Sequence, residues 1–167
     1  MELIDIVNDH NAVIGRISKD QLYDGPNNHR IVHVLIFNNK GDVALQLRSR
    51  TVAFLPSHWT TVVGGHVQAG ETVEQAAKRE MVEEIGVAVP FKKLFEIIYV
   101  PPQRPDMKKF LTIFKATHNG PFTPNPEDVE RVEFFSPNKI KQKIARGKNL
   151  HHEMVVIMKT LLQNKNR

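Results

Sequence analysis

The chain has 167 residues, of which 41% are hydrophobic and 25% are charged, and its formal net charge at pH 7 is +5. This length and balance are typical of a single soluble globular domain spanning 1–167, and they exclude a disordered or fibrous protein. Because the chain has no cysteine, disulfides, thiolate metal sites and thiol nucleophiles are also excluded, and any chemistry depends on oxygen and nitrogen groups.

The start of the chain and its charge indicate location and partners. No apolar run reaches membrane-spanning length, and with Glu2 and Asp5 among the first residues there is no basic start followed by an apolar core and a small-residue cleavage site, so we expect a cytoplasmic protein with no membrane partner. The positive charge favours an anionic ligand, although a basic cytosolic protein without one is an equally good interpretation. A basic stretch at 139–148 favours a solvated helix face over an RNA-contacting patch, so RNA is not the expected partner.

The N-terminal part is predicted to be β-structure. Residues 3–7 and 13–17 are rich in β-branched side chains and flank turn residues at 8–11, which predicts a hairpin. Residues 31–37 are almost continuously apolar, as in a strand that is covered on both faces. His33 within this run is typical of a packed core histidine rather than of a ligand.

A turn at 38–42 leads into a second sheet strand at 43–48. Its alternation predicts an apolar face made of Val43, Leu45 and Leu47. Gln46 and Arg48 are then expected to share the other, non-core face. Further strands are predicted at 60–63, 94–100, 110–117 and 129–135.

Three helices interrupt these strands. The first is predicted over 73–85, with Thr72 as N-cap, Gln75 completing a capping box and Gly86 at the C-terminal stop. The other two are predicted after Ser136-Pro137 and over about 150–162.

The helix at 73–85 ends in a cluster of acids that follows a glycine-rich loop. At 100° per residue, Glu83 and Glu84 lie on either side of Glu80, so three carboxylates share an arc of roughly 100°. Like charges at these spacings destabilise a helix by roughly 0.2–0.5 kcal/mol per pair, and the helix dipole disfavours anions at this end. A hard divalent cation offsets both penalties, and Mg²⁺ prefers one or two carboxylates plus substrate phosphate oxygens. The pattern therefore favours phosphate chemistry, with a solvated acidic helix end paired to Arg79 as the alternative.

Residues 65–87 also match, at every defined position, the Nudix signature G-x5-E-x7-R-E-U-x-E-E-x-G-U, in which U is a bulky apolar residue. The matching residues are Gly65, Glu71, Arg79, Glu80, Met81, Glu83, Glu84, Gly86 and Val87. The chain thus resembles the Nudix hydrolases. The resemblance implies an α/β (α+β) fold with a mixed β-sheet sandwiched between α-helices, and hydrolysis of a diphosphate (pyrophosphate) linkage. It also implies a structural ion pair in which Arg79 binds Glu71 and holds the loop against the helix.

The resemblance assigns a metal site as well. It implies that Glu80 and Glu84 are the principal ligands of Mg²⁺, for which Mn²⁺ can substitute. The carbonyl group of Gly65 can join the coordination, and Glu83 assists as a ligand or as a base.

Outside the signature, the chain resembles the Nudix branch related to isopentenyl-diphosphate isomerase over roughly 3–140. This weaker likeness rests on the N-terminal hairpin and on the segments His29-Arg30, 47–50 and 56–59. It implies that Arg48 contacts substrate phosphate, with Arg50 as a weaker candidate, while Trp59 either lines the pocket or only packs. Isomerase activity itself is disfavoured, because that family uses a catalytic cysteine.

A late acidic loop at 126–130 stands where many Nudix enzymes place an additional carboxylate. The resemblance nominates Glu127 or Asp128, although exposed acids in such a loop are more often only solvated. The leading hypothesis is therefore Mg²⁺-dependent hydrolysis of a nucleoside diphosphate derivative or a related small organic diphosphate. An isomerase-like protein, a non-catalytic ligand sensor and RNA-end processing are the alternatives. Neither the leaving group nor the choice between monomer and homodimer follows from the sequence.

Overall fold

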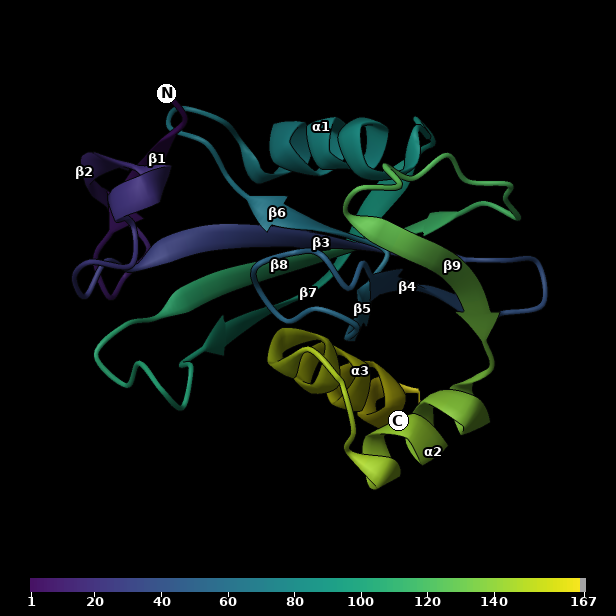
Figure 1. The fold of residues 1–167 in the computed structure, drawn as a ribbon. Helices are drawn as coiled ribbons and strands as arrows, with labels where there is room; N and C mark the ends of the chain where they lie inside the picture. Colours follow the sequence, from purple (N-terminus) through teal and green to yellow (C-terminus); the bar gives the residue numbers. More distant parts are fainter. Residues whose placement is uncertain (166–167) are drawn as a thin grey trace.

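The computed structural model describes residues 1–165, which form nine β-strands, three α-helices and one short 3-10 helix. In chain order the elements are β1 (Leu3–Val7), β2 (Val13–Ser18), the 3-10 helix η1 (Lys19–Gln21), β3 (His29–Phe37), β4 (Val43–Arg48), β5 (Trp59–Thr61), β6 (Val63–His66), α1 (Val73–Ile85), β7 (Phe91–Tyr99), β8 (Lys109–Thr117), β9 (Val129–Phe135), α2 (Pro137–Arg146) and α3 (His152–Asn164). Strands β3 to β9 make one sheet with α1 on one face and α2 and α3 on the other (Figure 1). The predicted mixed sheet between helices is confirmed, since β3 and β8 run parallel and the other pairs run antiparallel.

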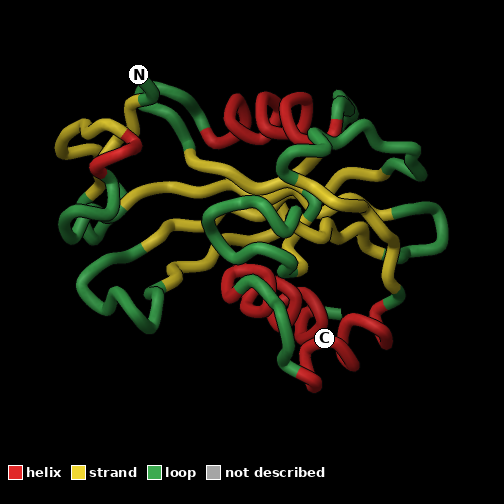
Figure 2. Tube along the Cα trace, in the orientation of Figure 1, coloured by secondary structure: helices red, strands yellow, loops and turns green. Residues whose placement is uncertain are grey.

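Two apolar layers explain why β3 is apolar throughout. Ile31 and Leu35 pack in the cluster that contains α3, whereas Val32 and Val34 pack against α1. The strand is therefore covered on both faces, as its composition predicted. Figure 2 shows the same layering, with helical segments above and below the strands.

The alternation predicted for β4 is confirmed, but the face that carries Gln46 was wrongly predicted to lie outside the core. It is buried as well. Ala44 is fully buried against the α1 layer, and Gln46 is only 6% exposed. The amide of Gln46 donates hydrogen bonds to the carbonyls of Thr61 and Val62, at 3.2 and 3.3 Å. Burial of this polar side chain is possible because these backbone groups satisfy its donors.

The strand predicted at 60–63 is in fact two short strands that belong to different halves of the sheet. β5 pairs with β4, whereas β6 pairs with β3. The chain crosses at Val62, which lies between the two strands. The sequence does not reveal this crossing, because the residues on both sides of it have high β-propensity and are extended.

The sheet divides between β3 and β4. These strands pair only at Phe37 and Val43, and beyond that point β6 continues the ladder beside β3 while β5 and β9 continue it beside β4. The two strands therefore diverge, and side chains from both helical layers can reach the opening between them. Within residues 1–165, no helix combines the length and the apolar character needed to cross a membrane.

Helix α1 has the bounds that its capping residues predicted. The Thr72 hydroxyl accepts a hydrogen bond from the backbone N–H of Gln75, and the Gln75 side chain accepts one from the N–H of Thr72. Gly86 ends the helix with φ of 65°, a left-handed conformation that favours glycine. These local interactions fix the position of the acids along the helix.

Candidate active site

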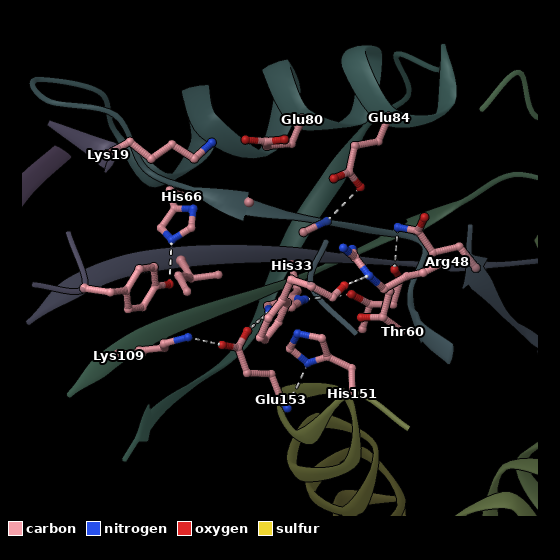
Figure 3. Close-up of a pocket in the computed structure, with 17 residues that line it drawn as sticks. Lys19, His33, Arg48, Thr60, His66, Glu80, Glu84, Lys109, His151 and Glu153 are labelled. Atoms are coloured by element: carbon pink, nitrogen blue, oxygen red, sulfur yellow. Dashed lines mark hydrogen bonds and ion pairs between the residues drawn. The ribbon is translucent and has the colours of Figure 1, made fainter. Parts of the chain in front are cut away.

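A pocket of about 650 Å³ lies where β3 and β4 diverge (Figure 3). One side is lined by Glu80 and Glu84 of α1, together with the glycines of β6. The opposite side is lined by His151 and Glu153 at the start of α3. The pocket therefore joins groups from both helical layers through the divided sheet.

The two α1 carboxylates in the pocket are both disfavoured as anions. Burial raises the pKa of Glu80 above its usual value, despite an ion pair with Arg79. Burial and the charge of Glu80 raise the pKa of Glu84 to about 8. The Glu84 carboxylate accepts a hydrogen bond from the backbone N–H of Gly64 at 3.1 Å, which holds it toward β6. A cation between the two groups would stabilise their ionised forms.

Gly65 packs directly against the Glu80 carboxylate. A Cβ atom at this position would collide with the Glu80 carboxylate. The absence of a side chain thus lets the backbone of β6 approach the carboxylate closely. This contact explains the first glycine of the signature in physical terms.

The predicted ion pair between Arg79 and Glu71 is present and bidentate. Arg79 Nε and Nη2 each lie 2.9 Å from a Glu71 carboxylate oxygen. The same guanidinium donates to the His66 carbonyl at 3.0 Å and to Glu80 at 2.7 Å. Arg79 therefore ties the loop before α1 to the helix and holds Glu80 in place.

Glu83 lies apart from the other two acids. Its side chain is 58% exposed, and it pairs with Arg79 at 3.1 Å outside the pocket. Within residues 1–165, no three His, Asp or Glu side chains converge closely enough to surround one ion. Glu80 and Glu84 nevertheless fit Mg²⁺, which commonly binds one or two protein carboxylates and completes its shell with water and phosphate oxygens. The raised pKa of Glu84 and the pocket that Gly65 lines together with both carboxylates support that fit.

Of the predicted substrate contacts, Arg48 reaches the pocket and the others lie elsewhere. Arg48 lines the pocket, and its Nε donates to the Phe54 carbonyl at 3.0 Å. Arg50 is exposed outside it. Trp59 packs edge-on against Phe135 with ring centroids 5.1 Å apart, so in this structure it packs rather than lines the pocket.

The late acidic loop is also outside the pocket. Glu127 and Asp128 are exposed, and the Asp128 carboxylate accepts a hydrogen bond from Asn125 at 2.8 Å. The charge of Asp128 is close enough to contribute to the raised pKa of Glu84. Asp128 is therefore the better placed of the two acids, and the roles of both stay predictions.

Several pocket residues escaped the sequence analysis. Lys109 comes from β8, Tyr23 follows η1, and His151 and Glu153 begin α3. His33 is buried as predicted, but it also lines the pocket and hydrogen bonds to Glu153 at 3.0 Å. This pair is separated by 120 residues, and no local pattern connects the two positions.

Three histidines in or near the pocket are neutral near pH 7. Burial lowers the pKa of His29 to about 4, of His66 to about 3 and of His151 to about 4. Between about pH 6.5 and pH 4 the unfolded chain binds protons at these positions, whereas the folded protein does not. These histidines therefore do not reduce the free energy of unfolding above about pH 6.5, but they reduce it progressively as the pH falls below that value.

We accordingly expect the metal-free protein to lose stability steeply in acid. The melting temperature should fall by roughly 10 °C or more between pH 7 and pH 4.5. His29→Gln should reduce this fall, because one buried group no longer titrates, whereas His10→Gln at an exposed position should leave it unchanged. Thermal denaturation across the pH range checks both variants. Identical profiles for the two variants would contradict the assignment.

Comparisons with known proteins agree with this fold. The family model of the NUDIX domain matches residues 27–155. The chain is 31% identical over 140 residues to the uncharacterized Nudix hydrolase YfcD of Escherichia coli (strain K12), covering 83% of this chain and 76% of that protein. It is 27% identical over 146 residues to a Nudix hydrolase of Deinococcus radiodurans, covering 87% and 85%.

Solved structures show the same architecture. The crystal structure of DR0079 from Deinococcus radiodurans has a TM-score of 0.83 and 24% identity, covering 95% of this chain and 98% of that chain. The MutT protein from Methanosarcina mazei Go1 has a TM-score of 0.70 and 18% identity, covering 86% and 98%. At these identities the likeness concerns the fold.

Fold and site together define a Nudix-fold protein in which the acids of the signature helix border a pocket. The chain belongs to the Nudix family. Members of this family generally cleave pyrophosphate linkages, so the prediction of a pyrophosphohydrolase is confirmed at the level of the family. The likeness to the branch related to isopentenyl-diphosphate isomerase stays a prediction.

Proposed function

We propose that this protein catalyses the Mg²⁺-dependent hydrolysis of a diphosphate linkage in a nucleoside diphosphate derivative or a related organic diphosphate. One observation carries the proposal: Glu80, Glu84 and Arg48 line the same pocket, although they come from α1 and β4. A small molecule in this pocket could therefore contact a metal ion held by the carboxylates and the guanidinium group at the same time. Family membership supports the reaction class.

Each of these residues has a role that follows from its position. Glu80 and Glu84 hold the cation, which when bound neutralises phosphate charge and lowers the pKa of an attacking water. Arg48 binds phosphate oxygens with its remaining guanidinium N–H groups. Glu83, Glu127 and Asp128 are the candidates for the base that takes the proton of the water. Asp128 is favoured among the late acids because its charge acts on Glu84.

We expect activity to require a divalent cation and to rise above neutral pH. The attacking water must lose a proton, and Glu84, whose pKa is raised to about 8 in the metal-free protein, binds a cation best when ionised. Phosphate release should be screened with Mg²⁺ and with Mn²⁺ over nucleoside di- and triphosphates, sugar nucleotides, dinucleoside polyphosphates and isoprenoid diphosphates. Full activity in excess EDTA, or no release from any of these compounds, would refute the proposed function.

We expect Arg48→Ala to raise the Michaelis constant more than it lowers turnover. A charged hydrogen bond to phosphate contributes about 1.5–3 kcal/mol, so the Michaelis constant should rise roughly tenfold to a hundredfold. Arg50→Ala removes the same charge from an exposed position and is the matched control. Steady-state kinetics on the best substrate distinguishes the two variants. An unchanged constant in Arg48→Ala places this arginine outside the substrate site.

The alternatives have less support. An isomerase-like reaction lacks the cysteine on which that family relies, because this chain has none. A non-catalytic sensor does not account for two largely buried carboxylates, one of which packs directly against a glycine of β6. RNA-end processing rests on the basic residues of α2, where Lys143 is placed over the rings of Trp59 and Phe135 rather than in the pocket.

A further inference from the structure

The side of the pocket next to α3 carries a buried ionic network that the Nudix signature does not include. Lys109 Nζ lies 2.8 Å from one carboxylate oxygen of Glu153, and His33 Nε2 lies 3.0 Å from the other. Their side chains are only 13%, 6% and 4% exposed, respectively for Lys109, Glu153 and His33. All three line the pocket, and Figure 3 shows them below the carboxylates of α1.

Within this network, Lys109 and Glu153 carry opposite charges that offset each other. Burial alone would raise the pKa of Glu153, but His33 and Lys109 lower it overall. Burial alone would lower the pKa of Lys109, but the charge of Glu153 raises it overall. The Glu153 carboxylate and the Lys109 ammonium group thus face the pocket as an ion pair.

His151 adds an uncharged donor beside this pair. Its Nδ1 accepts a hydrogen bond from the backbone N–H of Glu153 at 3.2 Å, and its low pKa keeps the ring neutral. The proton of the neutral ring is therefore on Nε2. His151 lines the pocket and packs edge-on against Phe54, with centroids 5.9 Å apart.

A purely structural role does not account for these polar groups. Removing two charges from water is costly, and apolar residues of similar volume often stabilise a core equally well. The pair sits at the wall of a pocket rather than between packed layers. Each Glu153 oxygen has one protein partner and keeps lone pairs for another, and Lys109 has more than one N–H to donate.

Lys109, Glu153 and His151, which line the side of the pocket next to α3, favour one kind of functional group on a ligand. A further phosphate would require a cation that is not already neutralised, and Glu153 neutralises Lys109. A hydrocarbon chain would displace the water that hydrogen bonds to these side chains and would offer no hydrogen bonds in return. A hydroxyl group donates to a carboxylate and accepts from an ammonium or imidazole N–H, so it satisfies both kinds of partner.

We propose that Lys109, Glu153 and His151 form a leaving-group subsite that takes an uncharged, hydroxyl-bearing part of the substrate. The inference rests on the proposed diphosphate hydrolysis and narrows its substrate class to diphosphates of polyols or sugars. Diphosphates of hydrocarbon chains are then poor substrates.

Two synthetic diphosphates of similar size test the subsite: ribose 5-diphosphate and cyclopentylmethyl diphosphate, which differ in ring oxygen and hydroxyl groups. With Mg²⁺, we expect kcat/KM for the ribose compound to be higher by roughly tenfold to a hundredfold, because one or two hydrogen bonds to charged groups are lost in the other. Calorimetry with the methylene-bridged, non-hydrolysable forms should give the same order of Kd values without turnover.

The double variant Lys109→Met/Glu153→Gln removes both charges and keeps similar side-chain volumes. The amide oxygen introduced by Glu153→Gln would still accept a hydrogen bond from His33, so folding should be retained, as a melting curve will show. The ratio of the two kcat/KM values should fall to within about threefold, since the loss of such contacts removes the discrimination. Lys78→Met/Glu74→Gln makes the same charge change on exposed positions of α1 and should keep the wild-type ratio.

The outcomes separate this inference from the proposed function. If wild type hydrolyses both compounds equally well, or if the double variant keeps the preference, the subsite is overturned and diphosphate hydrolysis stands. If neither compound is bound or hydrolysed, and the wider screen also fails, the proposed function falls and the subsite with it. The comparison in wild type decides the question even if the double variant does not fold.

Discussion

Glu84→Gln should reduce turnover at least roughly a hundredfold, which corresponds to about 3 kcal/mol of transition-state stabilisation. The substitution keeps side-chain volume and helix propensity but removes one of the two carboxylates that α1 presents to the pocket. The hydrogen bond from the Gly64 N–H can be retained by the amide oxygen. The loss should therefore appear in Mg²⁺-dependent activity and not in the fold.

The metal-free form of the same variant should become more stable than wild type as the pH rises. In wild type the folded-state pKa of Glu84 is raised from 4.5 to about 8, so the folded protein keeps a proton that the unfolded chain releases between these values. The stability contributed by that proton is present below about pH 4.5 and is lost as the pH rises through 8. Glutamine has no such proton, so metal-free Glu84→Gln should match wild type near pH 4.5 and melt increasingly higher than wild type as the pH rises from there to 9.

Turnover and melting curves of one preparation test both halves of this prediction. Glu74→Gln, an exposed acid in the first turn of α1, is the matched control and should change neither quantity appreciably. Near wild-type hydrolysis by Glu84→Gln would show that this carboxylate is not a metal ligand. Unfolding of its metal-free form at pH 7 would show that the acid is structural.

Arg79→Met should destabilise the protein by about 3 kcal/mol, a shift of roughly 6–12 °C in melting temperature for a chain of this size. Glu71 and Glu80 are 14% and 12% exposed, and both depend on this guanidinium for an ion pair. Removing one partner leaves buried carboxylates without compensation, which costs more than the pair itself contributes. The loop before α1 would also lose its tie to the His66 carbonyl.

Activity should fall together with stability in Arg79→Met, in contrast to Glu84→Gln. Denaturation curves with and without Mg²⁺, paired with turnover, separate the two cases. Lys78→Met changes the same charge on the neighbouring, exposed position and should leave both quantities near wild type. If Arg79→Met melts within about 2 °C of wild type, the guanidinium does not organise the loop.

The sequence determined those features that depend on neighbouring residues. The bounds of α1 follow from Thr72, Gln75 and Gly86, which satisfy its end groups locally. The spacing of Glu80 and Glu84 on that helix follows from its pitch. The apolar run in β3 required a covering layer on each face, and both layers are present.

Only the tertiary structure decided what surrounds those acids. The division between β3 and β4 turned one predicted strand into β5 and β6 and opened the pocket, and no local propensity encodes where a chain crosses between ladders. Likewise, Glu153 meets His33 across 120 residues and Lys109 across 44. The ionisation of these groups depends on burial and on partners that are brought together by folding. The sequence could therefore identify the acids of α1, but not the residues on the opposite side of the pocket.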